Sequence, residues 1–220
     1  MPKAAIFDLD GTLLDSVDLH AIAWHEAMVK FGHDVSFAQA RSQIGKGGDK
    51  LIPFFLSEDD QHDHGKELEE WRGERFRNKY LSLVRPFSAV PDLLRRVRGA
   101  GVRVAIASSA KKAELEEYLK IAHITDLVEV STSAEDAEES KPAPDVFEIV
   151  LKKLKIEGAD AVAIGDTPYD AEAAGKAKIA TIGVLCGGFT EDSLRKAGCV
   201  EVFPGPATLF AVFGASRLSR

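Results

Sequence analysis

Short runs of almost purely apolar residues constrain the fold of this 220-residue chain more than any other feature. They span residues 4–7, 102–107, 127–130, 161–164 and 179–184. Because they do not alternate between apolar and polar residues, each run is expected to be a strand buried on both faces. Amphipathic stretches at residues 90–100, 111–121, 145–155 and 169–176 predict helices between the later runs. Strands that alternate with helices predict an α/β fold, a doubly wound Rossmann-like parallel sheet.

Proline and glycine give the expected ends of some helices. Pro144 followed by Asp145 suits the first turn of a helix. Gly101 and Gly158 are expected to stop the helices that precede them.

Residues 15–85 interrupt the alternation of strands and helices. They contain no convincing strand, and this block is too long for a simple crossover between two strands. Apolar residues recur at helical spacing on one expected face, namely Ala21, Trp24, Ala27, Met28 and Phe31. We therefore predict an all-helical cap domain at residues 15–85, inserted into a catalytic core formed by residues 1–14 and 86–220.

The overall charge limits the classes of partner. Acidic residues outnumber basic ones 35 to 28, for a net charge of -7, which argues against a protein that binds a nucleic-acid backbone. A small anionic substrate is still compatible, since a few local cations suffice to bind it. No apolar stretch is long enough to span a bilayer, so we expect a cytoplasmic protein that is a monomer or a homodimer.

Asp8 and Asp10 follow the first apolar run and give the strongest chemical signal. Residues two apart in an extended chain project to the same side, so the two carboxylates would repel each other without a cation or a shared proton. A divalent metal would allow Asp8 to attack phosphorus while Asp10 holds a proton for the leaving oxygen. Gly11 permits a tight turn, and the amides that follow, including that of Thr12, are expected to bind phosphate oxygens. The alternative is an acidic surface turn, which an apolar strand leading directly into the motif disfavours.

Three further segments follow other expected strands. Asp166 and Asp170 lie after residues 161–164 and offer hard oxygen ligands for Mg²⁺, although either could instead cap the next helix. Ser108 and Ser109, followed by Lys111, suit either a phosphate contact or a helix cap. Lys141, shortly before a predicted helix, would supply a compact positive charge for phosphate or for crowded carboxylates.

The chain resembles the phosphatase branch of the haloacid dehalogenase superfamily. The resemblance rests on four motifs in order: Asp8-Leu9-Asp10-Gly11-Thr12, Ser108, Lys141-Pro142, and Gly165-Asp166 with Asp170. It covers nearly the whole chain, including a helical cap inserted after the first motif. The dehalogenase branch lacks an acid at the place of Asp10, because release of a halide needs no proton donor.

This resemblance implies a role for each acidic residue. Asp8 would be phosphorylated to give an aspartyl-phosphate intermediate. Asp10 would protonate the leaving alcohol and then activate the water that hydrolyses the intermediate. Mg²⁺ would be held by Asp8, by the main-chain carbonyl of Asp10 and by Asp166, with help from Asp170. The family likewise implies that Ser108 and Lys141 hold the transferring phosphoryl group.

The substrate is less well determined by the sequence. The segment Asp15-Ser16 with the following His20 resembles the sugar-phosphate branch, which includes β-phosphoglucomutase. His20 is therefore a candidate substrate contact, or else a partly buried helix residue whose ring is satisfied by a neighbour. Mutases of that type carry an acid where this chain has Gly165, and their second motif differs from the segment at residues 108–112, so a hydrolase is preferred over a mutase. In the glycine-rich segment at residues 44–50, Lys46 could meet a phosphosugar or a phosphoglycolate-like acid, or could be a solvated lysine. A binding module without catalytic activity is a weaker alternative.

Overall fold

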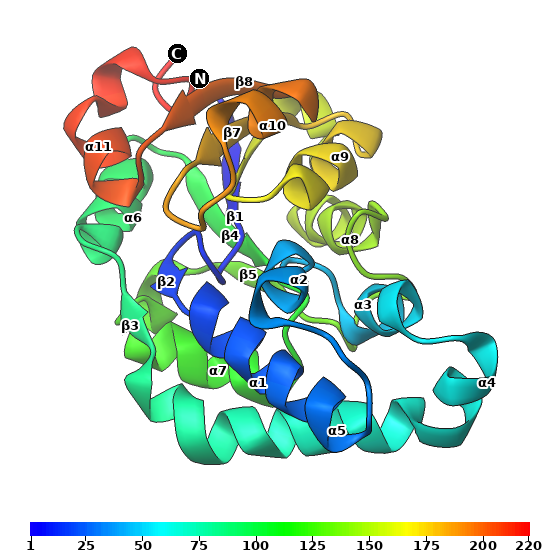
Figure 1. Cartoon of the computed structure of the whole chain (residues 1–220). Coiled ribbons are helices and arrows are strands. Elements are labelled where there is room, and N and C mark those ends of the chain that lie inside the picture. Colours follow the sequence, from blue (N-terminus) through cyan, green and yellow to red (C-terminus); the bar gives the residue numbers. More distant parts are fainter. The chain divides into compact units, whose positions relative to one another are not determined.

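The computed structural model describes the whole chain, Met1–Arg220 (Figure 1). The chain divides into two compact units. The first, the core unit, consists of Met1–Asp15 and Arg85–Arg220. The second, the helical unit, is Ser16–Val84. We describe each unit by itself.

A six-stranded parallel sheet forms the centre of the core unit. The strand order is β5-β4-β1-β6-β7-β8, so the first strand lies between β4 and β6. This arrangement confirms the expected α/β fold with a doubly wound parallel sheet. The strands are β1 (Ala4–Phe7), β4 (Arg103–Ala107), β5 (Val130–Thr132), β6 (Ala161–Gly165), β7 (Ala180–Val184) and β8 (Cys199–Phe203).

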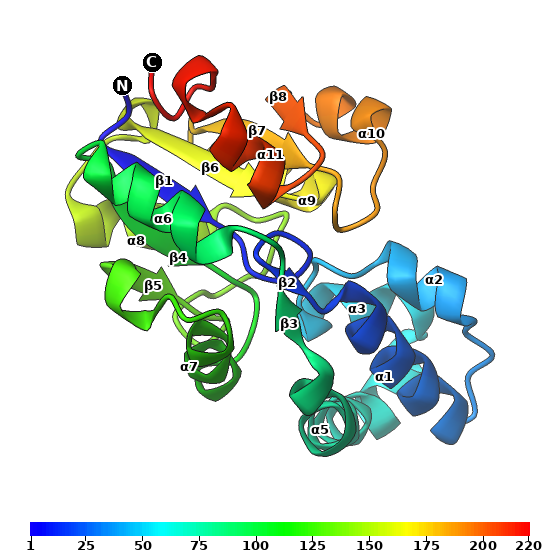
Figure 2. The ribbon, with the colours of Figure 1, turned by 90° about the vertical axis from the view of Figure 1, so that its left-hand side faces the viewer.

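Helices cover both faces of the sheet, as its apolar composition requires. On one face, small side chains of β1, β4 and β6 pack in a single cluster with α8 (Asp145–Leu154) and α9 (Pro168–Lys176). The intervening strand residues, such as Phe7 and Ile106, are also fully buried and point to the other face. Figure 2 shows α6 (Val90–Gly99) and α11 (Pro206–Ala211) in front of the sheet and α8 behind it. The remaining helices of this unit are α7 (Lys112–Ile121) and α10 (Glu191–Lys196).

The structure corrects one predicted helix end. Gly101, with φ 82°, follows α6 as expected. Helix α8, however, ends at Leu154, and Lys155 adopts the left-handed conformation at its C-cap. Gly158 is needed for a different reason, because a Cβ atom there would lie 2.1 Å from the backbone oxygen of Ala177.

Two strands differ from the predictions at the edges of the sheet. The run at residues 127–130 ends at the beginning of β5 rather than forming the strand, and Thr125–Leu127 is a 3-10 turn. Strand β8 at the opposite edge was not expected. A short antiparallel pair of β2 (Leu14–Asp15) and β3 (Arg85–Pro86) also forms where the chain leaves and re-enters the core unit.

The helical unit contains α1 (Val17–Lys30), α2 (Phe37–Ser42), α3 (Gly48–Phe55), α4 (Glu58–Asp60) and α5 (Lys66–Arg75), with π-helical turns at Gln61–Gly65 and Phe76–Tyr80 and a 3-10 turn at Leu81–Leu83. The predicted apolar face of α1 is confirmed. Ala21, Trp24, Ala27 and Met28 are buried in one cluster, and Phe31 packs against it. A membrane-spanning helix would need a longer apolar segment than any helix of the structure provides.

Candidate active site

The candidate site lies at the carboxyl ends of three neighbouring strands of the core unit. Asp8 directly follows β1, Ser108 follows β4 and Asp166 follows β6. Phe7 pairs with Ile106 on one side and with Ile164 on the other, so these strand ends are level with each other. Polar residues that are far apart in the sequence therefore meet at the carboxyl end of the sheet, where parallel sheets bind their ligands.

The segment after Asp8 forms a tight turn that fixes the first motif. The Asp8 amide donates to the Ile164 carbonyl at 2.9 Å, and the Leu9 carbonyl accepts from the amide of Leu14 at 2.9 Å. Gly11 has φ 79°, a conformation that favours glycine. The amides of Gly11 and Thr12 donate within this turn, to the Leu14 and Leu9 carbonyls. In the structure these two amides therefore bond within the turn, and a contact of this turn with phosphate oxygens stays a prediction.

Lys141 connects two of the acidic residues. Its Nζ atom lies 2.6 Å from Asp8 Oδ1, 2.7 Å from Asp170 Oδ1 and 2.8 Å from the Ala107 carbonyl oxygen. The side chain is 1% exposed. The ammonium group thus lies against two carboxylates and one backbone carbonyl. Lys141 is therefore held as a fixed positive charge beside Asp8.

The electrostatics of the cluster are governed by burial. Burial raises the pKa of Asp8 to about 7, with Asp170 and Asp10 contributing and Lys141 acting in the opposite direction. Burial and the neighbouring Asp170 also raise the pKa of Asp166 well above its usual range. Burial by itself would lower the pKa of Lys141, but the Asp170 and Asp8 carboxylates outweigh it and raise that pKa above its ordinary value. The ammonium therefore stays charged, while the carboxylates need further positive charge to ionise together.

The acidic residues fit a divalent metal ion. Asp8, Asp166 and Asp170 each place one carboxylate oxygen within 4.8 Å of the others, and all three are buried. Thr12 Oγ1 donates to Asp166 Oδ1 at 2.8 Å, whereas Asp166 Oδ2 is buried without a hydrogen-bond partner. Three carboxylates against the single charge of Lys141 leave the cluster negative. Oxygen donors with excess negative charge match the preference of hard divalent cations.

Asp170 has two functions, since it also caps α9. Its Oδ2 accepts from the Thr167 amide at 3.1 Å and from Thr167 Oγ1 at 2.6 Å, and the Asp170 amide donates back to Thr167 Oγ1. This capping box orients Oδ1 toward Lys141. Gly165 is packed against the same side chain, because a Cβ atom at this position would lie 2.5 Å from Asp170 Cβ.

The second motif lies after β4. Ser108 is buried, and its Oγ accepts from the Ala110 amide at 3.0 Å. It does not cap α7, because that helix begins at Lys112 and Lys111 occupies the N-cap position. Ser109 Oγ is buried without a hydrogen-bond partner. Lys111 is exposed.

The two predicted binding residues of the helical unit are both engaged inside that unit. His20 is buried, stacks on Phe76 with ring centroids 3.9 Å apart, and bonds to Arg72 through Nδ1. Lys46 Nζ donates to Gln43 Oε1 at 2.6 Å and lies 4.9 Å from the centre of the Phe54 ring.

The sequence did not draw attention to the turn after β7, which also lies beside the site. Cys186 Sγ donates to the Gly11 carbonyl at 3.1 Å. Burial, together with the charge of Asp166, raises the pKa of this thiol to about 12. A Cβ atom on Gly187 would lie 1.7 Å from Asp166 Oδ2. The available signal was position, since Cys186-Gly187 follows a buried strand just as Asp8, Ser108 and Asp166 do.

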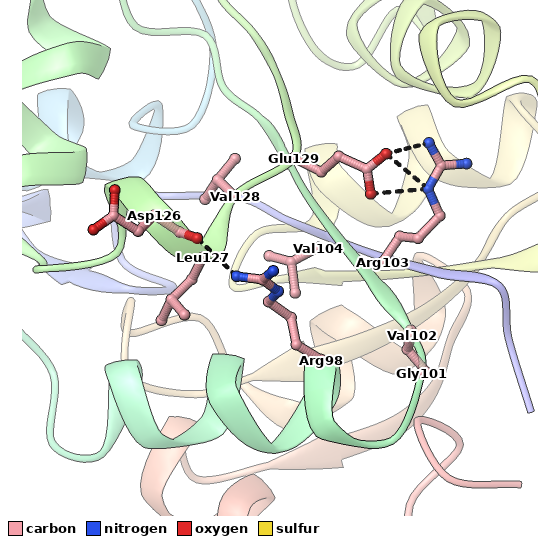
Figure 3. Close-up of a pocket in the computed structure, with 9 residues that line it drawn as sticks. All are labelled: Arg98, Gly101, Val102, Arg103, Val104, Asp126, Leu127, Val128 and Glu129. Atoms are coloured by element: carbon pink, nitrogen blue, oxygen red, sulfur yellow. Dashed lines mark hydrogen bonds and ion pairs between the residues drawn. The ribbon is translucent and has the colours of Figure 1, made fainter.

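A separate cavity of about 370 Å³ lies at the opposite end of β4 (Figure 3). Arg103 in its wall pairs with Glu129 at 2.5 Å, and Arg98 donates to the Asp126 carbonyl at 2.7 Å. Its lining consists of Arg98, Gly101, Val102, Arg103, Val104, Asp126, Leu127, Val128 and Glu129. Arg103 begins β4 and Ser108 follows its end, so the cavity is distinct from the candidate site.

Comparison with known proteins defines the class of the chain. The family model described as haloacid dehalogenase-like hydrolase matches residues 5–184. The chain therefore belongs to this family, which confirms the resemblance drawn from the four motifs and the expectation of a hydrolytic enzyme.

Individual relatives bear names of phosphatases. The chain is 29% identical to a phosphoglycolate phosphatase of Vibrio parahaemolyticus over 84% of both chains. It is 24% identical to a phosphorylated carbohydrates phosphatase of Thermotoga maritima, over 91% of this chain and 93% of the relative. A crystal structure of a hydrolase from Pseudomonas syringae matches the fold with a TM-score of 0.87 at 24% identity, over 96% of this chain and 98% of the other.

Proposed function

We propose that this protein is a magnesium-dependent phosphatase that hydrolyses small phosphomonoesters, either phosphosugars or phosphoglycolate-like acids. The observation that carries the proposal is the buried Asp8 carboxylate, held 2.6 Å from Lys141 and within 4.8 Å of the Asp166 and Asp170 oxygens. A buried nucleophile beside a fixed cation and a metal-binding cluster is what phosphoryl transfer requires, since positioning and charge neutralisation provide most of its catalysis.

In the proposed reaction, an oxygen of Asp8 attacks phosphorus and the bond from phosphorus to the leaving oxygen breaks. Asp10 gives its proton to that oxygen, so the alcohol leaves neutral. Asp10 then takes a proton from a water molecule that attacks the aspartyl phosphate, and phosphate and free Asp8 are regenerated. Asp10 lies half-buried in the turn after β1, two residues beyond the nucleophile.

The other residues of the site prepare Asp8 and hold the phosphoryl group. Mg²⁺, bound by Asp8, Asp166 and Asp170 with the main-chain carbonyl of Asp10, would neutralise charge on the phosphoryl oxygens and on the carboxylates. Lys141 favours ionisation of Asp8, whose pKa would otherwise be higher still. Hydroxyls after β4 bind phosphoryl oxygens in this proposal, and the unpartnered Ser109 Oγ supports it.

We assign substrate selection to the helical unit, as its cap domain. Lys46 and His20 are the candidate contacts. The Arg72 guanidinium contacts His20 Nδ1 and so fixes the orientation of the ring. Lys46 would offer a charge to a second anionic group of the substrate.

Hydrolysis is favoured over transfer between two positions of a sugar. The acid that mutases of the related branch carry before the fourth-motif aspartate is replaced here by Gly165, where a side chain would collide with Asp170. Product analysis from glucose 1-phosphate separates the two outcomes: free phosphate supports the hydrolase, and glucose 6-phosphate would support a mutase.

The proposal is tested by measuring phosphate release from p-nitrophenyl phosphate and a panel of phosphorylated metabolites, with Mg²⁺ and with EDTA. We expect Mg²⁺-dependent turnover that Asp8→Asn abolishes without changing the circular dichroism spectrum. Asp160→Asn is the matched control, because Asp160 pairs with Lys3 on the surface of the same unit. Asp8→Asn activity near that of the control would reject Asp8 as the nucleophile.

A further inference from the structure

The turn that follows β7 lies at the carboxyl end of the sheet, as the candidate site does. The Leu185 amide donates to the Phe203 carbonyl of β8 at 3.0 Å, and the Gly188 amide closes the turn onto the Leu185 carbonyl at 2.9 Å. Gly188 has φ 92°, which favours glycine at this position. The backbone of Cys186 and Gly187 between these bonds is therefore held against the sheet.

The carboxylate of Asp166 occupies the space that a side chain on Gly187 would need. An ideal Cβ atom on Gly187 would lie 1.7 Å from Oδ2, 2.4 Å from Cγ and 2.7 Å from Cβ of Asp166. Real side chains do not approach one another this closely, so a side chain at position 187 would have to displace the carboxylate. Displacement is costly because Asp166 is fully buried and its Oδ1 accepts from Thr12 at 2.8 Å.

Cys186 connects the same turn to the first motif by a hydrogen bond. Its Sγ donates to the Gly11 carbonyl at 3.1 Å and lies 3.9 Å from the Thr12 carbonyl oxygen. Gly205 packs against the thiol from the other side, since a Cβ atom there would lie 3.5 Å from Sγ. One short turn thus contacts both the loop that carries Asp10 and the carboxylate of Asp166.

We propose that Cys186 and Gly187 are positioning residues of the metal site: Gly187 fixes the rotamer of Asp166 by close contact, and the Cys186 thiol fixes the loop that carries Asp10. This inference rests on the proposed function only in taking Mg²⁺ as the ion of the site. Neither residue is expected to contact the metal or the substrate. Both would act by keeping the ligand oxygens within the spacing seen in the structure.

The test is calorimetric titration of Mg²⁺ into the full chain without substrate. We expect Gly187→Ala to weaken binding at least tenfold, because its methyl group displaces Asp166. Gly175→Ala is the matched control, since a Cβ atom at this position of α9 meets no atom within 4 Å, and we expect it to bind Mg²⁺ as the wild type does. Equal Mg²⁺ affinity for Gly187→Ala and Gly175→Ala would overturn the inference for Gly187.

Cys186 variants provide a second test, which also decides the matter if Gly187→Ala does not fold. Cys186→Ser keeps a hydroxyl donor for Gly11, and Cys186→Ala removes it. In the same titration we expect Cys186→Ala to raise the Mg²⁺ dissociation constant several-fold, with Cys186→Ser closer to the wild type. A general loss of packing would instead affect both variants equally, and that result would overturn the role of the thiol.

Failure of this inference can be distinguished from failure of the proposed function. A Gly187→Ala protein with unchanged Mg²⁺ affinity would contradict the inference while wild-type phosphatase activity stands. A wild type that binds Mg²⁺, loses it in Gly187→Ala and hydrolyses no phosphomonoester would uphold the inference and reject the function. A wild type that binds no divalent ion would overturn both.

Discussion

Replacing Lys141 by methionine removes the positive charge of the site while keeping a side chain of similar length. In the wild type, Lys141 Nζ is 2.6 Å from Asp8 and 2.7 Å from Asp170, and it is almost fully buried. The variant leaves these carboxylates close to Asp166 without a compensating cation. Breaking a buried pair from one side costs about 3–5 kcal/mol, and we expect a loss of this size at pH 8.

The loss should depend on pH in a defined direction. In the metal-free protein, the pKa of Asp8 is raised to about 7, so the folded state holds this proton at pH 5, where the unfolded chain has largely lost it. At pH 5 Asp8 is thus neutral, and Lys141 compensates less negative charge. At pH 8 Asp8 is ionised, so removal of Lys141 costs more. We expect the destabilisation at pH 5 to be about half of that at pH 8.

Urea unfolding in EDTA, followed by circular dichroism, measures the effect. With a slope of about 2–3 kcal/mol per molar urea, a loss of about 3–5 kcal/mol lowers the midpoint by about 1–2.5 M. Lys196→Met is the control, because Lys196 forms an exposed helix pair with Asp192 that should contribute about 0.3–0.5 kcal/mol. Equal destabilisation of Lys141→Met at pH 5 and pH 8 would show that packing rather than charge sets the cost, and would refute the electrostatic reasoning.

Three further results are expected. Mg²⁺ affinity should fall at least about tenfold for each pH unit below 7, because protons on Asp8 and Asp166 compete with the metal; titration calorimetry at pH 5, 6 and 8 that gave one affinity would contradict this. Glu26→Gln should lower the free energy of unfolding by about 1 kcal/mol at pH 7 and by little at pH 2. The reason is that the hydrogen bond from Arg75 lowers the pKa of Glu26 to about 2, so the stabilisation by Glu26 disappears as the pH falls from 4.5 toward 2. Urea midpoints of the variant and the wild type at both pH values check this direction. Gly158→Ala should lower the thermal midpoint by several degrees, because the new methyl group collides with the Ala177 carbonyl, and an unchanged midpoint would speak against that contact.

The central part of the fold could be predicted because burial dictates its composition. Strands β1, β4, β6 and β7 are covered on both faces, so their sequences are continuous apolar runs. The edge strand β5 is only partly buried and contains Ser131 and Thr132. The more apolar residues just before it were therefore predicted as the strand instead. Strand β8 carries the exposed Val200 and the half-buried Glu201, so its pattern resembles that of a surface segment. Strands buried on both faces can be recognised by their continuous apolar runs, and the edge strands β5 and β8 lack such runs.

The acidic part of the site could be predicted because strand ends place charged residues together whatever the details of packing. Asp166, Asp170 and Lys141 do converge on Asp8. The hydrogen-bond partners of individual backbone amides could not be predicted, since they depend on the turn that Gly11 makes. Gly187 was missed for a more basic reason: its contribution is the absence of a side chain, and residue chemistry gives no sign of that.

The contact between Gly165 and Asp170 also limits how this enzyme could change its reaction by evolution. An acid at position 165, as in the related mutases, cannot be introduced here by one substitution, because its Cβ would lie 2.5 Å from Asp170 Cβ. The side chain of Asp170, which also forms the capping box of α9, would first have to move. The geometry therefore disfavours any side chain at position 165 while Asp170 keeps its present position.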